Sequence, residues 1–506
     1  MRIPLYVFVV IPPVLFFLLG LLYPTVQLLF SGLVTSSTST SLWEDPFIRH
    51  VITFTYTQAL CSAFLSLLVG TTGAIIFSEQ RFWGRAFFWR ASLVCYSLPS
   101  ILVVLAILGF WGNGIYGWPA ILLANTFFNF PLFLKAVGNS LSEMNRDEEK
   151  AALSLGANRW ICFFRVTLPK ILPELKSTFV LTFLLCSSAS FLVVLLLGGG
   201  PSFTTLEVAI YQAVKVDYEP ALAARLGIIQ MLVAVVLYLC FLRGEKPAAE
   251  RNAGAFFPLY LFRRSGINLF FRAVYFLFMA FLVVGPLAIL VVSGLSGSWP
   301  TDWNGFFVPV VTSLKLGAMT SVITLVLASA FAYFERHVPF SQLKTLISIL
   351  AGLPLSLSTI LVTLSLVVAF PSFYQDYRGY LLPIAVVQSL VALPVVYRPI
   401  RDGFFRIPDS LYQASASLGA TSFRTLCLVE FPLLRKSIGV ACLLAIAFSL
   451  GEVGAVMLFQ TEEIATLPLQ MFRLMGQYRF DQAYHLGLLL LGLMGTIFWL
   501  TGELET

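Results

Sequence analysis

The chain has 506 residues, of which 58% are hydrophobic and only 11% are charged, and its mean hydropathy is +0.88. This number of charges is too small to cover the surface of a soluble protein of this length. Most of the chain must therefore face lipid. The net charge of +7 accompanies no nucleic-acid-binding motif and indicates basic residues held on the cytoplasmic side of a membrane. The seven cysteines form no CxxC pair and no Cys/His cluster, which excludes a disulfide scaffold and predicts no metal site.

The apolar runs, taken in chain order, predict transmembrane helices. The first run, 5–30, is too long for the apolar core of a signal peptide, so we interpret it as an uncleaved first span. Every span must be a helix, because lipid leaves loose backbone groups without hydrogen-bond partners. We therefore expect an all-α polytopic membrane protein with twelve transmembrane helices, six in each half. The remaining predicted spans are 52–77, 91–111, 118–137, 177–198 and 222–242, followed by 273–294, 311–334, 343–370, 379–397, 437–459 and 484–500.

Two charged segments, 140–173 and 403–436, interrupt the apolar pattern and repeat each other. Both contain A-(A/S)-x-x-L-G-A and, eight residues later, V-x-(L/F)-P, at a constant offset of 263 residues. A repeat on this scale indicates that the chain consists of two homologous halves. We place the first half at residues 1–242 and the second at 273–506, joined by a cytoplasmic linker at 243–272.

The distribution of lysine and arginine predicts the orientation in the membrane. With the N-terminus inside, 25 of the 32 basic residues fall on cytoplasmic segments. Both termini and both repeated segments are then cytoplasmic. Because six crossings return the chain to the same side, we expect the two six-helix repeats to run parallel, related by an axis along the membrane normal.

Each repeated segment predicts a pair of short helices. Asn145, with Glu148 three residues on, is the expected cap of the first pair, and Asp409 or Ser410 that of the second. A glycine breaks the first helix of each pair, and a proline ends the second helix. Small residues on one helix face favour a helix that lies in a groove of another protein. The alternative is a loop that only packs on its own helices, but two matching copies on one side favour docking. The candidate docking residues are Glu149, Ala151, Ala152, Leu155, Gly156, Ala157 and Pro169 in the first copy, and Ala414, Ser415, Leu418, Gly419, Ala420 and Pro432 in the second.

The two segments resemble the EAA motif, E-A-A-x(3)-G-x(9)-I-x-L-P, of permease subunits in binding-protein-dependent ABC importers. The leading acid of the motif is replaced by Lys150 and Gln413, with Glu149 one place early. Valine replaces the isoleucine in both copies, and Phe431 replaces the leucine in the second. The resemblance implies the type I importer permease fold, with each segment acting as a coupling helix seated in a cytoplasmic ATPase subunit.

The resemblance also implies partners and a location. The implied partners are two copies of an ABC ATPase and one periplasmic or lipid-anchored binding protein. The binding protein would dock on the outer loops 31–51, 198–221 and 461–483. One copy of this chain would suffice per transporter, and it would lie in the bacterial cytoplasmic (inner) membrane. The sequence contains no GxxxxGK(S/T) loop, so we expect no cofactor in this chain and expect ATP and Mg²⁺ to bind in the partner ATPase.

Both halves in one chain are typical of ferric-iron and thiamine importers. Residues 197–230 look most like thiamine permeases, whereas 448–458 resemble a segment shared with ferric, sulfate and molybdate permeases. We therefore expect thiamine or a thiamine phosphate as the substrate, with ferric iron as the alternative.

Three residues are candidates for the transport pathway. Glu452, inside the predicted eleventh span, could meet a cationic substrate, but the same acid in anion permeases favours a structural or gating role. Glu207, in the connection between the fifth and sixth spans, could also meet a cation, although a surface carboxylate is the favoured interpretation. Tyr211 lies in the same connection.

Two other function classes fit the sequence less well. A secondary transporter would usually carry more charges at the membrane midplane, and it would leave the repeated segments unexplained. A membrane-embedded enzyme would need a catalytic constellation, and the sequence has no G-x-S-x-G, no HExxH and no paired intramembrane carboxylates. We expect no catalytic residue in this chain.

Overall fold

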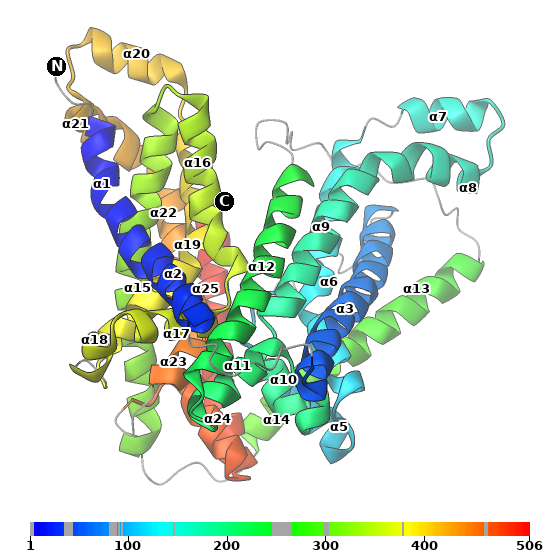
Figure 1. The fold of residues 1–506 in the computed structure, drawn as a ribbon. Helices are drawn as coiled ribbons and strands as arrows, with labels where there is room; N and C mark the ends of the chain where they lie inside the picture. Colours follow the sequence, from blue (N-terminus) through cyan, green and yellow to red (C-terminus); the bar gives the residue numbers. More distant parts are fainter. Residues whose placement is uncertain are drawn as a thin grey trace. The chain divides into compact units, whose positions relative to one another are not determined.

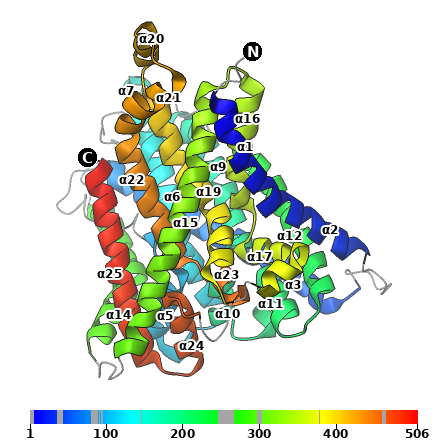
Figure 2. The ribbon, with the colours of Figure 1, turned by 90° about the vertical axis from the view of Figure 1, so that its left-hand side faces the viewer.

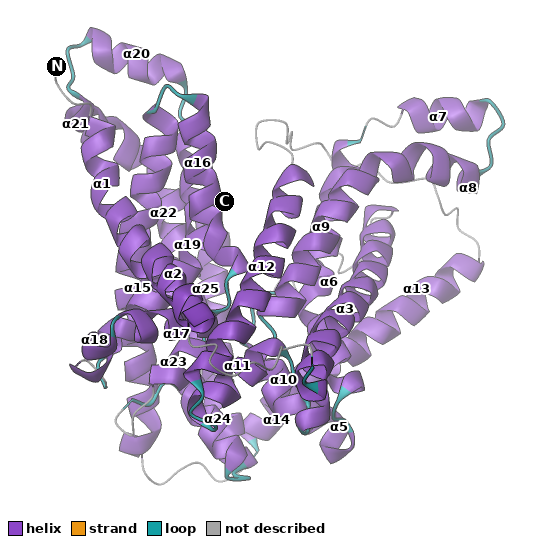
Figure 3. Ribbon diagram, viewed as in Figure 1, coloured by secondary structure: helices purple, strands orange, loops and turns teal. Residues whose placement is uncertain are grey.

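The computed structural model describes residues 5–34, 44–79, 89, 92, 95–144, 147–244, 266–296, 303–376, 379–459 and 464–505. Throughout these ranges the regular elements are all helices (Figures 1 and 3). Ten of the described helices are long and apolar enough to cross a membrane, and a bent pair of helices provides an eleventh candidate span. The predicted class, an all-α polytopic membrane protein, is confirmed.

The helices pack into two compact units that do not follow the order of the chain. The first unit contains Met1–Thr40, Glu207–Met231 and Ser293–Thr506, and the second contains Ser41–Leu206 and Leu232–Val292. The opening helices of the chain therefore pack with the second sequence repeat: α1 (Leu5–Phe17) contacts α15 (Trp303–His337), and α2 (Tyr23–Val34) contacts α17 (Thr359–Ala369). The boundaries predicted at 242 and 273 describe the repeat of the sequence. In the packing units, the first helices of the first half lie with the second half, and the first helix of the second half lies with the first half.

In the second unit three long helices form the core. They are α3 (Pro46–Glu79), α6 (Trp118–Glu143) and α9 (Leu168–Ser188). A Cβ atom at Gly70 would lie 2.3 Å from the backbone oxygen of Phe130, so glycine permits α3 and α6 to approach closely. The other described helices of this unit are α5 (Ser100–Trp111), α7 (Asp147–Ser154), α8 (Arg159–Cys162), α10 (Phe191–Leu197) and α13 (Gly266–Met279).

In the first unit α15, α19 (Leu381–Arg406) and α22 (Phe431–Gly451) repeat this three-helix core. The remaining helices that lie wholly in this unit are α16 (Ser341–Gly352), α18 (Pro371–Asp376), α20 (Asp409–Ser417), α21 (Ser422–Thr425), α23 (Gly454–Phe459), α24 (Leu467–Gly476) and α25 (Phe480–Glu505). α11 (Leu206–Lys215), α12 (Pro220–Gly244) and α14 (Gly285–Leu295) belong partly to each unit.

A buried polar contact recurs in both three-helix cores. In the second unit the Asn125 amide donates to Gln58 Oε1 at 3.0 Å and to Ser62 Oγ at 3.3 Å. In the first unit Gln388 occupies the place of Asn125, 263 residues later, and accepts hydrogen bonds from Thr320 Oγ1 at 3.1 Å and Ser449 Oγ at 2.6 Å. Side-chain hydrogen bonds of this kind hold helices together in lipid, where apolar burial gives little preference for one partner.

The third predicted span of each half is not a straight helix. In the second half α16 and α17 are bent by 100° around the tight turn Leu353–Ser356. Helical backbone continues through Leu353 and Pro354, and the break comes directly after this turn, where Leu357 and Ser358 adopt extended backbone with ψ 130° and 140°. In the first half the predicted span 91–111 lies partly outside the described residues, and its described helix α5 begins directly after Pro99.

The fifth predicted span of each half is also broken. Residues 177–198 and 437–459 were expected to be continuous, but α9 ends at Ser188 before α10, and α22 ends at Gly451 before α23. Further along the chain, each broken span is followed by a short helix, α11 or α24, whose first residue is hydrogen-bonded to a long core helix. The N–H of Leu206 in α11 donates to Thr55 Oγ1 at 2.9 Å, and that of Leu467 in α24 donates to Ser313 Oγ at 2.8 Å.

Candidate coupling loops and membrane-embedded acids

The two repeated segments fold as helix–turn–helix loops. α7 and α8 form the first loop and α20 and α21 the second (Figure 1). Within the first unit α20 lies at the end opposite α24, and the turned view agrees (Figure 2). We call these elements the first and second coupling loops from here on.

Both loops turn through a glycine in the left-handed backbone conformation. Gly156 has φ +84° and Gly419 has φ +74°. The N–H of the following alanine bonds back to the first helix in each loop, Ala157 to Ala152 O and Ala420 to Ser415 O, both at 3.0 Å. This is the bonding of a helix C-cap with a left-handed residue, a conformation that costs other residues free energy. A Cβ atom at either glycine would meet nothing within 4 Å, so backbone conformation rather than crowding favours glycine.

The tip of each loop presents large apolar side chains to the surroundings. Leu155 and Leu418, each directly before the glycine, are both 88% exposed. Trp160 and Phe423, again 263 residues apart, are 60% and 63% exposed. An exposed apolar cluster at the tip of a loop indicates an interaction site. The remaining candidates at the loop surfaces are Ala151, Ala414, Pro169 and Pro432, which are exposed, and Ala152, Ala157 and Ala420, which are half-buried.

Two of the predicted docking residues face inward. Glu149 is buried and accepts a hydrogen bond from Thr167 Oγ1 at 2.6 Å. Ser415 is buried and accepts from Thr425 Oγ1 at 3.2 Å. These bonds hold the first short helix of each loop against the segment that follows it.

The prolines do not end the second short helices. A π turn follows each short helix, at Phe163–Thr167 and Leu426–Glu430, and leads into α9 and α22, which begin with Pro169 and Pro432 in their first turns. Proline is tolerated in the first turn of a helix, and the wider π turn lets the chain continue without a break. The predicted termination was wrong for this reason.

The predicted N-cap residues of the two loops are Asn145 and Asp409 or Ser410. Asn145 lies outside the described residues. Asp409 is the first residue of α20 rather than its cap, the cap position is Pro408, and no side-chain cap bond forms there. The Asp409 carboxylate pairs instead with the Arg336 guanidinium.

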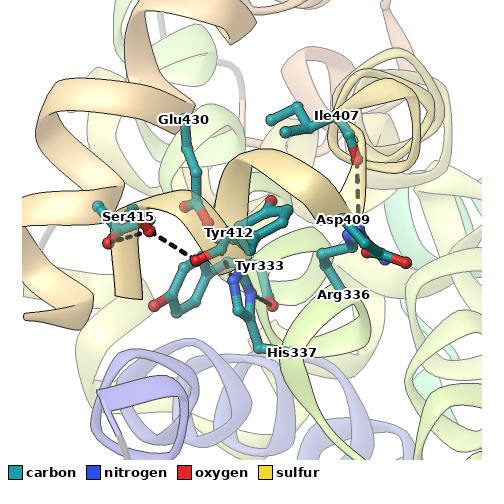
Figure 4. Close-up of polar contacts among 9 residues, drawn as sticks. Tyr333, Arg336, His337, Ile407, Asp409, Tyr412, Ser415 and Glu430 are labelled. Carbon is teal, nitrogen blue, oxygen red and sulfur yellow. Dashed lines mark hydrogen bonds and ion pairs between the residues drawn. The ribbon is translucent and has the colours of Figure 1, made fainter. Parts of the chain in front are cut away.

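Charged and aromatic residues meet where the second coupling loop joins the end of α15 (Figure 4). His337, the last residue of α15, places Nε2 2.9 Å from Glu430 Oε1 and Nδ1 2.9 Å from the backbone oxygen of Tyr333. The Glu430 side chain is only 1% exposed. Burial and the negative charge of Glu430 raise the pKa of Tyr412 to about 12.

A second ionic group lies nearby between α15 and α19. Glu335 accepts from Arg401 Nε, with both oxygens at 2.9 Å, and also pairs with the Tyr397 hydroxyl. In the first half leucine and glycine stand at the places of Tyr397 and Arg401. None of Glu335, His337 and Glu430 was among the site residues predicted from the sequence. For Glu335 and His337 the available signal was the short charged run 335–337, directly after the predicted span 311–334.

Glu452 is not inside a helix. It lies in the break between α22 and α23, where its Oε1 accepts from the N–H of Gly454 at 2.7 Å. Its Oε2 accepts from the N–H of Ala455 at 3.2 Å and from Gln388 Nε2 at 3.4 Å. The carboxylate therefore caps the first turn of α23 and joins it to the polar contact of the core. The first half has Ala189 at the same place.

Glu207 and Tyr211 stand one turn apart on α11. Glu207 is only 3% exposed, so the expectation of a surface carboxylate was wrong. Tyr211 is half-buried. Both belong to the first unit.

A helical membrane protein that carries the same coupling loop in each of two homologous halves has the architecture of a two-half transport permease. Residues 66–243 and 325–501 each match the family described as binding-protein-dependent transport system inner membrane component, and the chain belongs to this family. The two matched regions include the two coupling loops. The predicted repeat and the predicted permease family are both confirmed.

Similar proteins match along nearly the whole chain. The chain is 30% identical over 486 residues to the thiamine transport system permease protein ThiP of Brucella abortus (strain 2308), covering 89% of this chain and 87% of that protein. It is 28% identical over 492 residues to ThiP of Escherichia coli (strain K12), covering 90% and 89%. The Fe(3+)-transport system permease protein FbpB 2 of Haemophilus influenzae is more distant, at 22% over 445 residues and 85% of each chain.

Proposed function

We propose that this chain is the permease subunit of an ATP-driven importer that carries thiamine or a thiamine phosphate from a binding protein into the cytoplasm. The observation that carries the proposal is the similarity to thiamine permeases at 28–30% identity over about nine-tenths of the chain. The iron permease matches less of the chain at lower identity, which makes ferric iron the second candidate.

We propose that the two coupling loops are the docking sites for a separate ATPase. The exposed Leu155 and Leu418, with identical exposure and the same glycine turn, support docking to two identical partner subunits. In this proposal one copy of the chain binds two copies of the ATPase, which hold ATP and Mg²⁺, while the chain itself holds no cofactor. Closure of the ATPase dimer moves the two loops, and the permease alternates between outward and inward access.

On the opposite side we propose docking of the binding protein. Tyr218 and Tyr478 are the only non-glycine residues with positive φ in the described ranges, at 56° and 60°, and they are 80% and 86% exposed. Each stands two residues before the next long helix, α12 or α25. A strained backbone can mark a functional site. The Tyr478 ring contacts the ring of Phe480, with 6.4 Å between centroids, but most of each tyrosine side chain is open to a partner. An exposed tyrosine is a common anchor in protein interfaces.

The proposed orientation follows from the charges. Both termini and both coupling loops face the cytoplasm of a bacterial cell, because the basic residues concentrate on those segments. The tyrosines would then face outward. Glu207 and Tyr211 remain proposed pathway residues, whereas the hydrogen bonds of Glu452 favour a structural role.

Uptake of labelled thiamine and labelled ferric iron, in cells with and without the gene, tests the proposal. Loss of thiamine uptake alone supports it. Loss of iron uptake alone would replace the substrate, and loss of neither would refute both candidates. Co-purification of a cytoplasmic ATPase separates an ABC importer from a secondary transporter, which needs no such partner.

A further inference from the structure

Four helices of the first unit meet at one carboxylate, that of Glu452. α22 ends directly before this residue, and α23 begins two residues after it. The carboxylate accepts from the N–H groups of Gly454 and Ala455 in α23. It also accepts from Gln388 Nε2 in α19 and from the Thr359 hydroxyl in α17. We propose that Glu452 is a positioning residue, which joins α17 to α23 and transmits the movement of α22 to both. The inference rests on the proposed function, because it concerns how ATP hydrolysis in the partner drives transport.

α22 connects this carboxylate to the second coupling loop. One π turn, Leu426–Glu430, separates α21 from α22, and α22 then continues without a break to Gly451. Its 21 residues span about 30 Å. Because a packed helix moves as a rigid element, a shift at the coupling loop also moves the far end of α22, where Glu452 stands.

α17 and α23 are both short helices that begin at Glu452. α17 follows the 100° bend after α16 and starts at Thr359, and α23 has only six residues. The two helices pack against each other, and both views show them side by side (Figures 1 and 2). The first N–H groups of a helix have no partner within it, so an acceptor from outside stabilises its start. By bonding to the first residue of α17 and to the first turn of α23, the carboxylate holds the two starts together.

Close packing reinforces this joint. A Cβ atom at Gly454 would lie 3.2 Å from Ile360 Cγ1 and 3.5 Å from Thr359 Cβ. The absence of a side chain on α23 therefore permits its close approach to α17. Ile360 is only 1% exposed, so the contact excludes solvent.

Gln388 holds the carboxylate to the three-helix core of the unit. Its side chain is 0% exposed, and its Oε1 accepts from Thr320 Oγ1 in α15 and from Ser449 Oγ in α22. Since both partners of Oε1 are donors, the amide is oriented with Nε2 toward Glu452. The joint therefore connects the two short helices to α15, α19 and α22 together.

The first half of the chain differs at both places. Ala189 stands where the second half has Glu452, and Phe191 stands where it has Gly454. The alanine side chain has no acceptor, and the phenylalanine ring adds bulk where α23 has none. The proposed transmission through a carboxylate therefore belongs to the second half.

The test uses the full transporter, with the ATPase and the binding protein, in proteoliposomes. The readout is thiamine transported per ATP hydrolysed. In Glu452→Ala we expect this ratio to fall at least about twofold, because α22 would move without carrying α17 and α23. Phe17→Leu is the control for a general loss of stability, since Phe17 is 1% exposed in α1 of the same unit and has no part in the joint. Its ratio should stay at the native level.

A disulfide bond between α17 and α23 provides a test of rescue. The separation of 3.5 Å between Thr359 Cβ and a Cβ atom at Gly454 lies within the range of about 3.5–4.5 Å that a disulfide bridges. Glu452→Ala also removes the oxygen that would lie 3.1 Å from the new Cβ atom. Combined with Thr359→Cys and Gly454→Cys, this variant should form the bond on oxidation, as detected by mass spectrometry.

The oxidised triple variant should regain the native ratio and lose it again on reduction with dithiothreitol. The two variants that combine Glu452→Ala with a single cysteine are the matched controls, and their ratio should stay low in both conditions. A native ratio in folded Glu452→Ala, an equal fall in Phe17→Leu, or a formed disulfide that restores nothing would overturn the inference. Failure of the native protein to transport thiamine or to bind the ATPase would instead refute the proposed function.

Discussion

Leu155 and Leu418 stand 263 residues apart, directly before left-handed glycines, and each is 88% exposed. The two copies of the turn hold an apolar side chain in the same exposed position. This indicates that each loop binds the same kind of partner surface. Replacement of either leucine by serine should weaken binding of the ATPase by about tenfold to about a hundredfold, because burial of a leucine contributes about 1.5–3 kcal/mol. The double variant should lose binding altogether. Affinity of the purified permease for the ATPase is the measurement.

Val216→Ser serves as the control for the leucines, because Val216 is 64% exposed but belongs to the connection before α12 and not to a coupling loop. Equal loss of ATPase binding in the control would show a general effect of removing surface apolar groups. Unchanged binding in the double leucine variant would refute docking through these tips.

The two loop glycines are expected to tolerate asparagine better than alanine. Gly156→Ala and Gly419→Ala force a Cβ atom into left-handed backbone at about 1–2 kcal/mol each, whereas asparagine visits this region more readily. Transport per ATP should therefore fall in the alanine variants and fall less in the asparagine variants. Because a Cβ atom meets nothing within 4 Å at either place, equal effects of alanine and asparagine would show that bulk at the docking surface, rather than backbone conformation, matters.

Glu452 is predicted to act as a cap and not as a substrate ligand. Glu452→Ala should lower the free energy of unfolding by about 1–2 kcal/mol, since the first N–H groups of α23 lose their acceptor. Glu452→Gln retains one acceptor oxygen and should lose less. Thermal unfolding of the purified protein and the concentration dependence of thiamine uptake are measured together. Normal stability with a raised KM for thiamine in the glutamine variant would contradict this role.

Tyr218 and Tyr478 offer a test that separates function from stability. Replacement of either by glycine removes the strain of the left-handed backbone, so the free energy of unfolding should stay the same or rise by up to about 1 kcal/mol. The affinity for the binding protein should nevertheless fall severalfold, because the exposed ring is lost. Binding of the purified binding protein to the reconstituted permease is the measurement. Retained affinity in the variant carrying both replacements would eliminate these tyrosines as contacts.

The class, the repeat and the coupling loops could be predicted because they depend on local patterns. Long apolar runs require helices in lipid, and the Leu-Gly-Ala pattern at 155–157 and 418–420 predicts a helix end at each glycine. The expectation that Pro169 ends a helix failed because a proline at the end of one segment and at the start of the next gives the same local signal. Only the π turn before α9 decides between them.

The buried ion pairs could not be predicted, because they join residues far apart in the sequence. His337 and Glu430 meet only after the second coupling loop folds back onto α15, and Glu335 meets Arg401 across two packed helices. The break at Glu452 was hidden for a related reason. An acid in an apolar run has the same sequence signal whether it lines a pathway or caps a short helix, and its bonds to Gly454 and Ala455 decide the matter.

The exchange of first helices between the two units also lies beyond local patterns. Residues 5–30 form an apolar helix whose sequence does not specify which neighbouring surface it covers. In the structure Phe17 of this segment is 1% exposed and lies 6.1 Å from the ring of Phe331 in α15. Complementary packing of large side chains, which emerges only in three dimensions, determines that choice.

We propose that this permease imports thiamine when a separate ATPase acts on its coupling loops. Accumulation of labelled thiamine in proteoliposomes that contain this chain, the ATPase and the binding protein tests this proposal directly. We expect accumulation that requires ATP, the binding protein and intact leucines at 155 and 418. Accumulation without ATP, or none with all components present and ATP being hydrolysed, would contradict it.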